Sequence, residues 1–155
     1  MAVISGDTPS KDSWYIDCAT ASHICGDRQK FVRYKQYAKR EAREIRDFAG
    51  RVAGKAIGYG DVRLRLRLPG GHRNEVIVRN FLHVDGAHNS LSQSRLMDQG
   101  LWTVPVNGYG IKKYDKSPAE DSARGRGSFV GIAHQIGGLF QLDVKVAGNR
   151  YRARE

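Results

Sequence analysis

The sequence predicts an all-β fold: a closed or nearly closed β-barrel of roughly eight to ten strands, with one short helix near residues 90–99. Three observations lead to this class. Residues 61–68 alternate apolar side chains with arginines, which is the period-two pattern of a half-buried strand. Asn107-Gly108 separates two apolar runs, and this pair is the strongest short signal of a β-hairpin. The chain also holds 18 glycines, which indicates many turns.

The N-terminal half supplies several of these strands. Residues 1–13 are polar and are expected to be loose. The apolar run at 13–17, which stops at an acid, predicts a buried strand, and residues 31–37 predict another. The charged stretch 39–47 fits a helical turn or a strand edge, and neither is preferred. Residues 75–84 are the expected hairpin partner of the strand at 61–68.

Glycines at positions 54, 58 and 60 come just before the alternating strand. Their spacing suits either a mobile β-hairpin tip or a bulged strand. A phosphate-binding loop is disfavoured, because the Walker spacing with its terminal Lys and Ser or Thr is missing.

The single predicted helix lies in the C-terminal half. Ser90 and Gln93 make a capping-box pattern, and Gly100 is placed to end the helix. Its expected apolar face consists of Leu91, Leu96 and Met97.

The predicted barrel spans residues 14–114. A surface loop should follow at 115–127, then closing strands at 128–146 and a basic tail at 147–155.

Composition sets limits on function. Apolar runs are too short for a transmembrane helix, so no membrane partner is expected. The N-terminus is too short and too early acidic for a signal peptide. Two cysteines, Cys18 and Cys25, cannot form a disulfide scaffold and fit a reducing compartment.

The net charge of +10 should attract polyanions, nucleic acid above all. Cations are densest at residues 28–46, where Phe31, Tyr34 and Tyr37 could stack on bases. The competing interpretation is a solvated face whose aromatic rings point into the core. The absence of an RRM or KH signature favours this second interpretation.

Asp17 is the candidate residue for acid–base chemistry. It closes an apolar strand and is followed by the small residues Cys18, Ala19 and Thr20. Two carboxylates brought together at such strand ends share one proton, so that one acts as a base towards water and the other as an acid towards a carbonyl. The alternative is an aspartate that only caps a turn. Asp85-Gly86-Ala87 looks superficially like a second copy, but Asp-Gly is an ordinary turn pair.

Several sequence motifs occur in a specific order along the chain. Trp14, Asp17 and His23 match the pattern Trp-hydrophobic-hydrophobic-Asp-Ser-Gly-Ala-x-x-His. The matching later segments are residues 78–84, 89–96 and 138–143. As an ordered set, they resemble the retropepsin-like β-barrel domain of copia-type LTR-retrotransposon Gag-Pol polyproteins, the tobacco-retrotransposon-like Pol β-barrel domain. The resemblance covers about residues 14–143. Residues 138–143 resemble the segment that opens the family's pre-integrase region, so residues 128–146 are expected to hold the closing strands and the start of that region.

The resemblance implies a homodimeric aspartic endopeptidase that processes its polyprotein, with one aspartate and one flap from each chain. It implies Asp17 as the catalytic residue and Cys18, Ala19 and Thr20 as the active-site loop. The implied flap consists of Ile57, Gly58, Tyr59 and Gly60. It also implies a peptide substrate, no cofactor, no metal, and a cytoplasmic location in a virus-like particle or polyprotein.

The sequence departs from the family at three adjacent positions. Cys18 replaces Ser or Thr, and a thiol is a weaker hydrogen-bond donor than a hydroxyl. Ala19 replaces Gly, which costs on the order of 1 kcal/mol if the position needs a positive φ. Thr20 replaces Ala and adds a polar group. These departures suggest an alternative: a degenerate, catalytically dead barrel with a structural role or a nucleic-acid-binding role through Arg63, Arg65 and Arg67. The competing and favoured interpretation of these three arginines is the solvent face of a hairpin.

Cys18, His23 and Cys25 allow two further interpretations. A zinc site would need a fourth ligand, and the Cys-x4-His-x-Cys spacing is not that of a knuckle or finger. A Cys–His nucleophile pair would need a residue that orients the imidazole, and none is evident in the sequence. Buried structural thiols are the simpler explanation.

Overall fold

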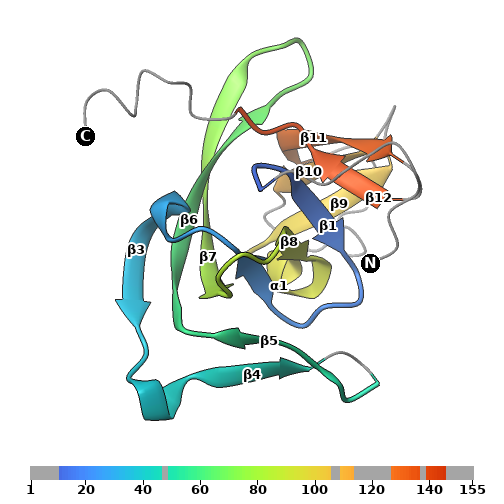
Figure 1. Ribbon diagram of the computed structural model, residues 1–155. Helices are drawn as coiled ribbons and strands as arrows, with labels where there is room; N and C mark the ends of the chain where they lie inside the picture. Colours follow the sequence, from blue (N-terminus) through green and yellow to red (C-terminus); the bar gives the residue numbers. More distant parts are fainter. Residues whose placement is uncertain (1–10, 47–48, 106–108, 114–126, 137–138, 146–155) are drawn as a thin grey trace.

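A computed structural model describes residues 11–46, 49–105, 109–113, 127–136 and 139–145 (Figure 1). These residues form 12 strands, one α-helix and two 3₁₀ turns. The elements are β1 (Trp14–Asp17), β2 (His23–Cys25), η1 (Arg28–Lys30), β3 (Phe31–Gln36), η2 (Lys39–Glu41), β4 (Arg43–Arg46), β5 (Val52–Ala56), β6 (Gly58–Arg67), β7 (Arg73–His83), β8 (Asn89–Ser92), α1 (Gln93–Asp98), β9 (Leu101–Pro105), β10 (Tyr109–Lys113), β11 (Ser128–Ile136) and β12 (Leu139–Leu142). The predicted all-β class is confirmed.

Ten strands form one curled sheet in the order β3-β6-β7-β2-β8-β1-β12-β11-β10-β9, and β4 pairs with β5 separately. The chain after β12 returns to β6, where Leu66 and Val144 form an antiparallel bridge. The backbone N–H of Arg67 donates to the Asp143 carbonyl at 3.0 Å, and that of Lys145 donates to the Arg65 carbonyl at 2.9 Å. This return links β6, β7, β2, β8, β1 and β12 into a barrel circuit.

The core lies inside this circuit. On β6 the apolar set Val62, Leu64 and Leu66 is buried, and the arginines between them are exposed, as the alternation predicts. The Trp14 ring meets Phe81 edge-on, with centroids 5.5 Å apart. Each such buried side chain contributes about 1.5–3 kcal/mol through removal of apolar surface from water.

A bulge interrupts the pairing of β6 with β7, where the register shifts between Gly60 and Val62. Opposite the shift, Asn80 has φ = +64°, a backbone region that asparagine tolerates better than most residues. The N–H groups freed by the bulge are taken up by side chains: Arg79 N–H donates to Gln99 Oε1 at 3.1 Å, and Asn80 N–H donates to Asp61 Oδ1 at 3.2 Å.

The helix differs from its prediction in detail. Its N-cap is Ser92, the last residue of β8, whose Oγ accepts the Arg95 N–H at 3.3 Å, whereas Ser90 lies two residues earlier, inside that strand. Of the predicted apolar face, Leu96 is buried in the helix, Leu91 is buried in β8, and Met97 is 40% exposed. Gly100 follows the helix with φ = +77°, as a glycine after a C-cap often does.

Several predictions can be placed on the remaining strands. The undecided segment 39–47 is both a 3₁₀ turn, η2, and a strand, β4. The hairpin around Asn107-Gly108 is confirmed as the antiparallel pair β9–β10, while its turn, residues 106–108, lies outside the described residues. Residues 1–10, 115–126 and 147–155 also lie outside them. Among described helices, none is long and apolar enough to cross a membrane.

Candidate functional site

Asp17 is the last residue of β1, which runs parallel to β8 with Asp17 opposite Ser92. Because parallel strands end at the same edge, Asp17 and the N-cap of α1 lie side by side at one end of the barrel. The loop of residues 18–22 leaves this edge and leads into β2.

Three hydrogen bonds tie this loop and the start of β2 to the residues that begin α1. Ser92 Oγ donates to the Thr20 carbonyl at 2.7 Å, and Arg95 Nε donates to the Ala21 carbonyl at 2.9 Å. The Ser92 N–H donates to His23 Nδ1 at 2.9 Å. The second half of the loop that follows Asp17 is therefore tied to the start of α1.

The Asp17 carboxylate is half-buried, and one of its oxygens, Oδ1, accepts the Ala19 N–H at 2.8 Å. Its other oxygen has no hydrogen-bond partner among the described residues. Cys18 and Ala19 are exposed. Within a single chain, Asp17 thus makes the turn-capping contact that was the alternative expectation, and it keeps one oxygen available.

The departures from the family pattern fit this loop. Asn80 is the single non-glycine residue with a positive φ in the described chain, so Ala19 carries no left-handed strain. The Thr20 hydroxyl donates to the Ser22 carbonyl at 3.1 Å, which satisfies its added polar group. The expected cost at position 19 is therefore absent.

His23 is buried beside this loop. Burial, with a further contribution from the Arg95 charge, lowers the pKa of His23 to about 4. The imidazole is neutral at pH 7, as required by a ring nitrogen that accepts the Ser92 N–H.

The fold should therefore weaken in mild acid. In the unfolded chain His23 takes up a proton near pH 6.5, but in the folded chain it does so only near pH 4. Stability from this group is present above pH 6.5 and lost as the pH falls towards 4, by about 3 kcal/mol in total. Urea unfolding measured across this window checks the loss.

The matched variant is His23→Asn, whose Oδ1 can still accept the Ser92 N–H but does not titrate. We expect lower stability at pH 7, from the smaller side chain, and a shallower dependence on pH. Burial lowers the pKa of His83 as well, so some slope should remain. An unchanged slope in His23→Asn would contradict the assignment.

The residues expected to form the flap lie in and next to a strand that is paired on both sides. Gly58, Tyr59 and Gly60 belong to β6 and are paired on both sides, with β3 and with β7. The Ile57 N–H donates to the His83 carbonyl, and the Ile57 carbonyl accepts the Tyr37 N–H, both at 2.9 Å. The hairpin-tip interpretation is therefore wrong, because both strand edges are occupied. The bulged-strand alternative agrees with the register shift that follows Gly60.

The arginines of β6 face carboxylates. Arg63 and Arg65 lie 3.9 and 3.5 Å from Glu75, and Arg67 lies 3.8 Å from Asp143. Burial alone would raise the pKa of Asp143, but hydrogen bonds from His134 and Arg73 outweigh it and lower that pKa. Asp143 is therefore a stable anion, and the three arginines are a partly neutralised stripe.

The two cysteines have different surroundings. Cys18 is exposed, whereas Cys25 is buried, and burial raises the pKa of its thiol to about 11. In the described part of the chain, no three histidine, cysteine or acidic side chains gather as metal ligands would. His23 Nδ1 is engaged by Ser92 rather than by a thiol.

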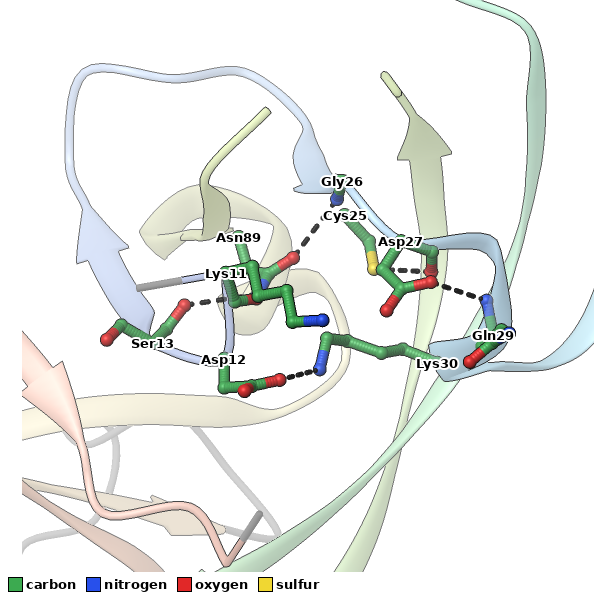
Figure 2. Close-up of polar contacts among 9 residues, drawn as sticks. All are labelled: Lys11, Asp12, Ser13, Cys25, Gly26, Asp27, Gln29, Lys30 and Asn89. Atoms are coloured by element: carbon green, nitrogen blue, oxygen red, sulfur yellow. Dashed lines mark hydrogen bonds and ion pairs between the residues drawn. The ribbon is translucent and has the colours of Figure 1, made fainter. Parts of the chain in front are cut away.

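Asn89 lies at the other end of β8 from Ser92 and connects three segments of the chain, a role that the sequence did not reveal (Figure 2). Its fully buried side chain accepts the Gly26 N–H at 3.0 Å and donates to the carbonyls of Lys11 and Ser13 at 2.7 and 3.2 Å. Asn89 thereby joins the entry to β1, the exit from β2 and the start of β8. Nearby, Lys30 pairs with Asp12 at 2.7 Å.

Together these features define a β-barrel domain with an aspartate at the end of a central strand and an anchored loop of small residues after it. Residues 14–101, which are more than half of the chain, match the family described as Pol polyprotein, beta-barrel domain. The chain belongs to this family and is a module of a Pol polyprotein. No curated protein and no solved structure matches it.

The matched region ends at Leu101, the first residue of β9, so β10–β12 follow it, yet β12 pairs directly with β1. The segment that resembled the opening of a pre-integrase region, residues 138–143, therefore contributes a barrel strand through Leu139–Leu142.

Proposed function

We propose that this chain is the aspartic-peptidase-type barrel of a copia-type retrotransposon polyprotein, and that two copies bring their Asp17 side chains together to cleave the polyprotein. The observation that carries the proposal is the state of Asp17. One carboxylate oxygen is fixed by the Ala19 N–H, the other is without a partner in the described chain, and the loop beside it is exposed.

The chemistry follows from two carboxylates at short distance. Both cannot be ionised side by side, so the pair holds one proton. The ionised Asp17 takes a proton from water as the water attacks the peptide carbonyl, and the protonated Asp17 donates to the carbonyl oxygen. Such a pair works on the acid side of neutrality. His23 has a pKa of about 4, and its protonation destabilises the fold. The stability of the fold therefore sets the lowest pH at which cleavage can occur.

The β4–β5 hairpin is the better candidate for a flap than residues 57–60. It forms its own two-stranded sheet, outside the ten-stranded one. In the view of Figure 1, the hairpin and the loop that follows β1 both lie at the lower end of the molecule. At its base Ala56 is fully buried, which anchors one end of the hairpin to the barrel.

A second candidate function is a non-catalytic barrel in the same polyprotein. Cys18 favours it, because an exposed thiol stands where the family has a hydroxyl that donates across the dimer axis. In this case two copies need not meet at Asp17.

The test is cleavage of an unstructured protein, such as denatured casein, at pH 5.5, with products identified by mass spectrometry. We expect cleavage whose rate per chain rises with chain concentration, as a homodimer requires. A statine-containing peptide, which mimics the tetrahedral intermediate, should inhibit it. No cleavage at concentrations where the chain is dimeric would favour the second candidate.

A further inference from the structure

We propose that the outer face of β3 and β6 binds single-stranded nucleic acid, through the surface formed by Arg33, Lys35, Tyr37, Arg43 and Tyr59. We call it the Tyr37–Tyr59 surface. It goes beyond the proposed peptidase function and does not depend on Asp17.

The five side chains gather because of strand register. Lys35 of β3 lies opposite Tyr59 of β6, and alternate residues of β3 share a face. The Tyr37 and Tyr59 rings lie 5.2 Å apart, and the Arg43 guanidinium lies 5.6 Å from the Tyr37 ring. Tyr59 is 37% exposed, and Arg33, Lys35 and Arg43 are exposed.

The other aromatic residues of the basic segment 28–46, Phe31 and Tyr34, belong to the core. Phe31 is buried, and the Tyr34 hydroxyl is 2.7 Å from Nδ1 of the buried His83. The expectation that the rings of residues 28–46 point inwards therefore holds for Phe31 and Tyr34. Tyr37 differs, because its ring lies against that of Tyr59 on the outer face.

The charge of this surface is not neutralised by ion pairs. No carboxylate lies within ion-pairing distance of Arg33, Lys35 or Arg43 among the described residues, and the same holds for Lys39 and Arg40 in the adjoining turn η2. The nearby carboxylates of Glu41 and Asp61 accept backbone N–H groups. The Arg63, Arg65 and Arg67 stripe differs, because each of these arginines faces an acid.

Unpaired cations beside partly exposed aromatic rings fit one class of ligand best. The phosphates of a nucleic acid supply the negative charge, and unstacked bases can stack on the tyrosine rings. This stacking stabilises the complex whatever the base sequence. A duplex keeps its bases stacked on one another, so the occupant is a single strand. An acidic polypeptide would neutralise the positive charge but would gain less binding free energy from the tyrosine rings.

The experiment measures fluorescence anisotropy of a labelled 12-nucleotide oligo(U) RNA with the full chain at low salt. Tyr37→Leu/Tyr59→Leu keeps apolar bulk without the rings and should weaken binding about tenfold or more. Arg33→Gln/Lys35→Gln removes two cations and should reduce the slope of log affinity against log salt by about 1.4. The control Arg63→Gln/Arg65→Gln removes the same charge elsewhere and should change affinity less than about twofold.

A readout without variants comes from photo-cross-linking of a 4-thiouridine oligonucleotide, which should attach at Tyr37 or Tyr59. Absence of binding at low salt, equal losses in the two charge variants, or no loss in the tyrosine variant would overturn the proposal. Equal competition by polyglutamate would also overturn it, by showing an acidic-polypeptide surface. Asp17→Asn should bind the RNA normally, which separates this result from the outcome for the peptidase.

Discussion

Replacing Asp17 by asparagine should abolish peptide cleavage, with a loss of about 1,000-fold or more. The amide oxygen can still accept the Ala19 N–H, so the loop keeps its hydrogen bond. What disappears is the ability of the pair to hold one proton and one negative charge. The measurement is the cleavage rate at pH 5.5, with urea unfolding to show that the variant is folded.

The matched control is Asp85→Asn. Asp85 begins the Asp-Gly-Ala triplet that resembles a second active-site motif, but its side chain is 83% exposed in a turn where Gly86 has φ = +74°. We expect its cleavage rate to stay within about twofold of wild type, as for a surface substitution away from the chemistry. Cleavage that survives in Asp17→Asn, or that is lost equally in Asp85→Asn, would exclude the role assigned to Asp17.

Replacing Asn89 by alanine should lower the free energy of unfolding by about 3–5 kcal/mol. Three backbone groups lose their partner: the Gly26 N–H and the carbonyls of Lys11 and Ser13. Each buried polar group left without a hydrogen bond costs about 1–3 kcal/mol, although some regain water. Against typical stabilities of about 5–15 kcal/mol this is a large share.

Asn74→Ala provides the comparison for this variant. Asn74 is half-buried and makes one such bond, to the Val130 carbonyl at 3.2 Å, so its loss should cost about 1 kcal/mol. Urea unfolding of both variants at pH 7.5, where His23 is neutral in both states, gives the two values. Equal losses would show that Asn89 is not the main connection among the three segments.

Patterns of short range predicted much of the fold. Strand β6 could be predicted because apolar residues and arginines alternate along it, and the β9–β10 pair because Asn-Gly suits a tight turn. Asp17 could be found because it ends an apolar run and is followed by small residues. In each case the signal lies within about ten residues of chain.

Contacts between distant residues could not be predicted in this way. The Leu66–Val144 bridge, the link from Asn89 to Gly26 and the Ser92–His23 bond all join separate parts of the chain. The hairpin-tip interpretation of the glycines at positions 54, 58 and 60 failed for the same reason. Gly60 is a glycine because a Cβ there would overlap the Arg33 carbonyl of β3, and not because a hairpin tip needs freedom.

Chemical cross-linking through Cys18 tests most directly whether two copies meet at Asp17. Cys18 is exposed, while Cys25 is fully buried with a pKa raised to about 11, so a short bismaleimide should react at Cys18 alone. A two-fold axis that brings the Asp17 carboxylates together also brings the two Cys18 residues close. We predict a covalent dimer that is absent in Cys18→Ser. A chain that associates but gives no such dimer, or that cleaves peptides as a monomer, would contradict the meeting of the two aspartates.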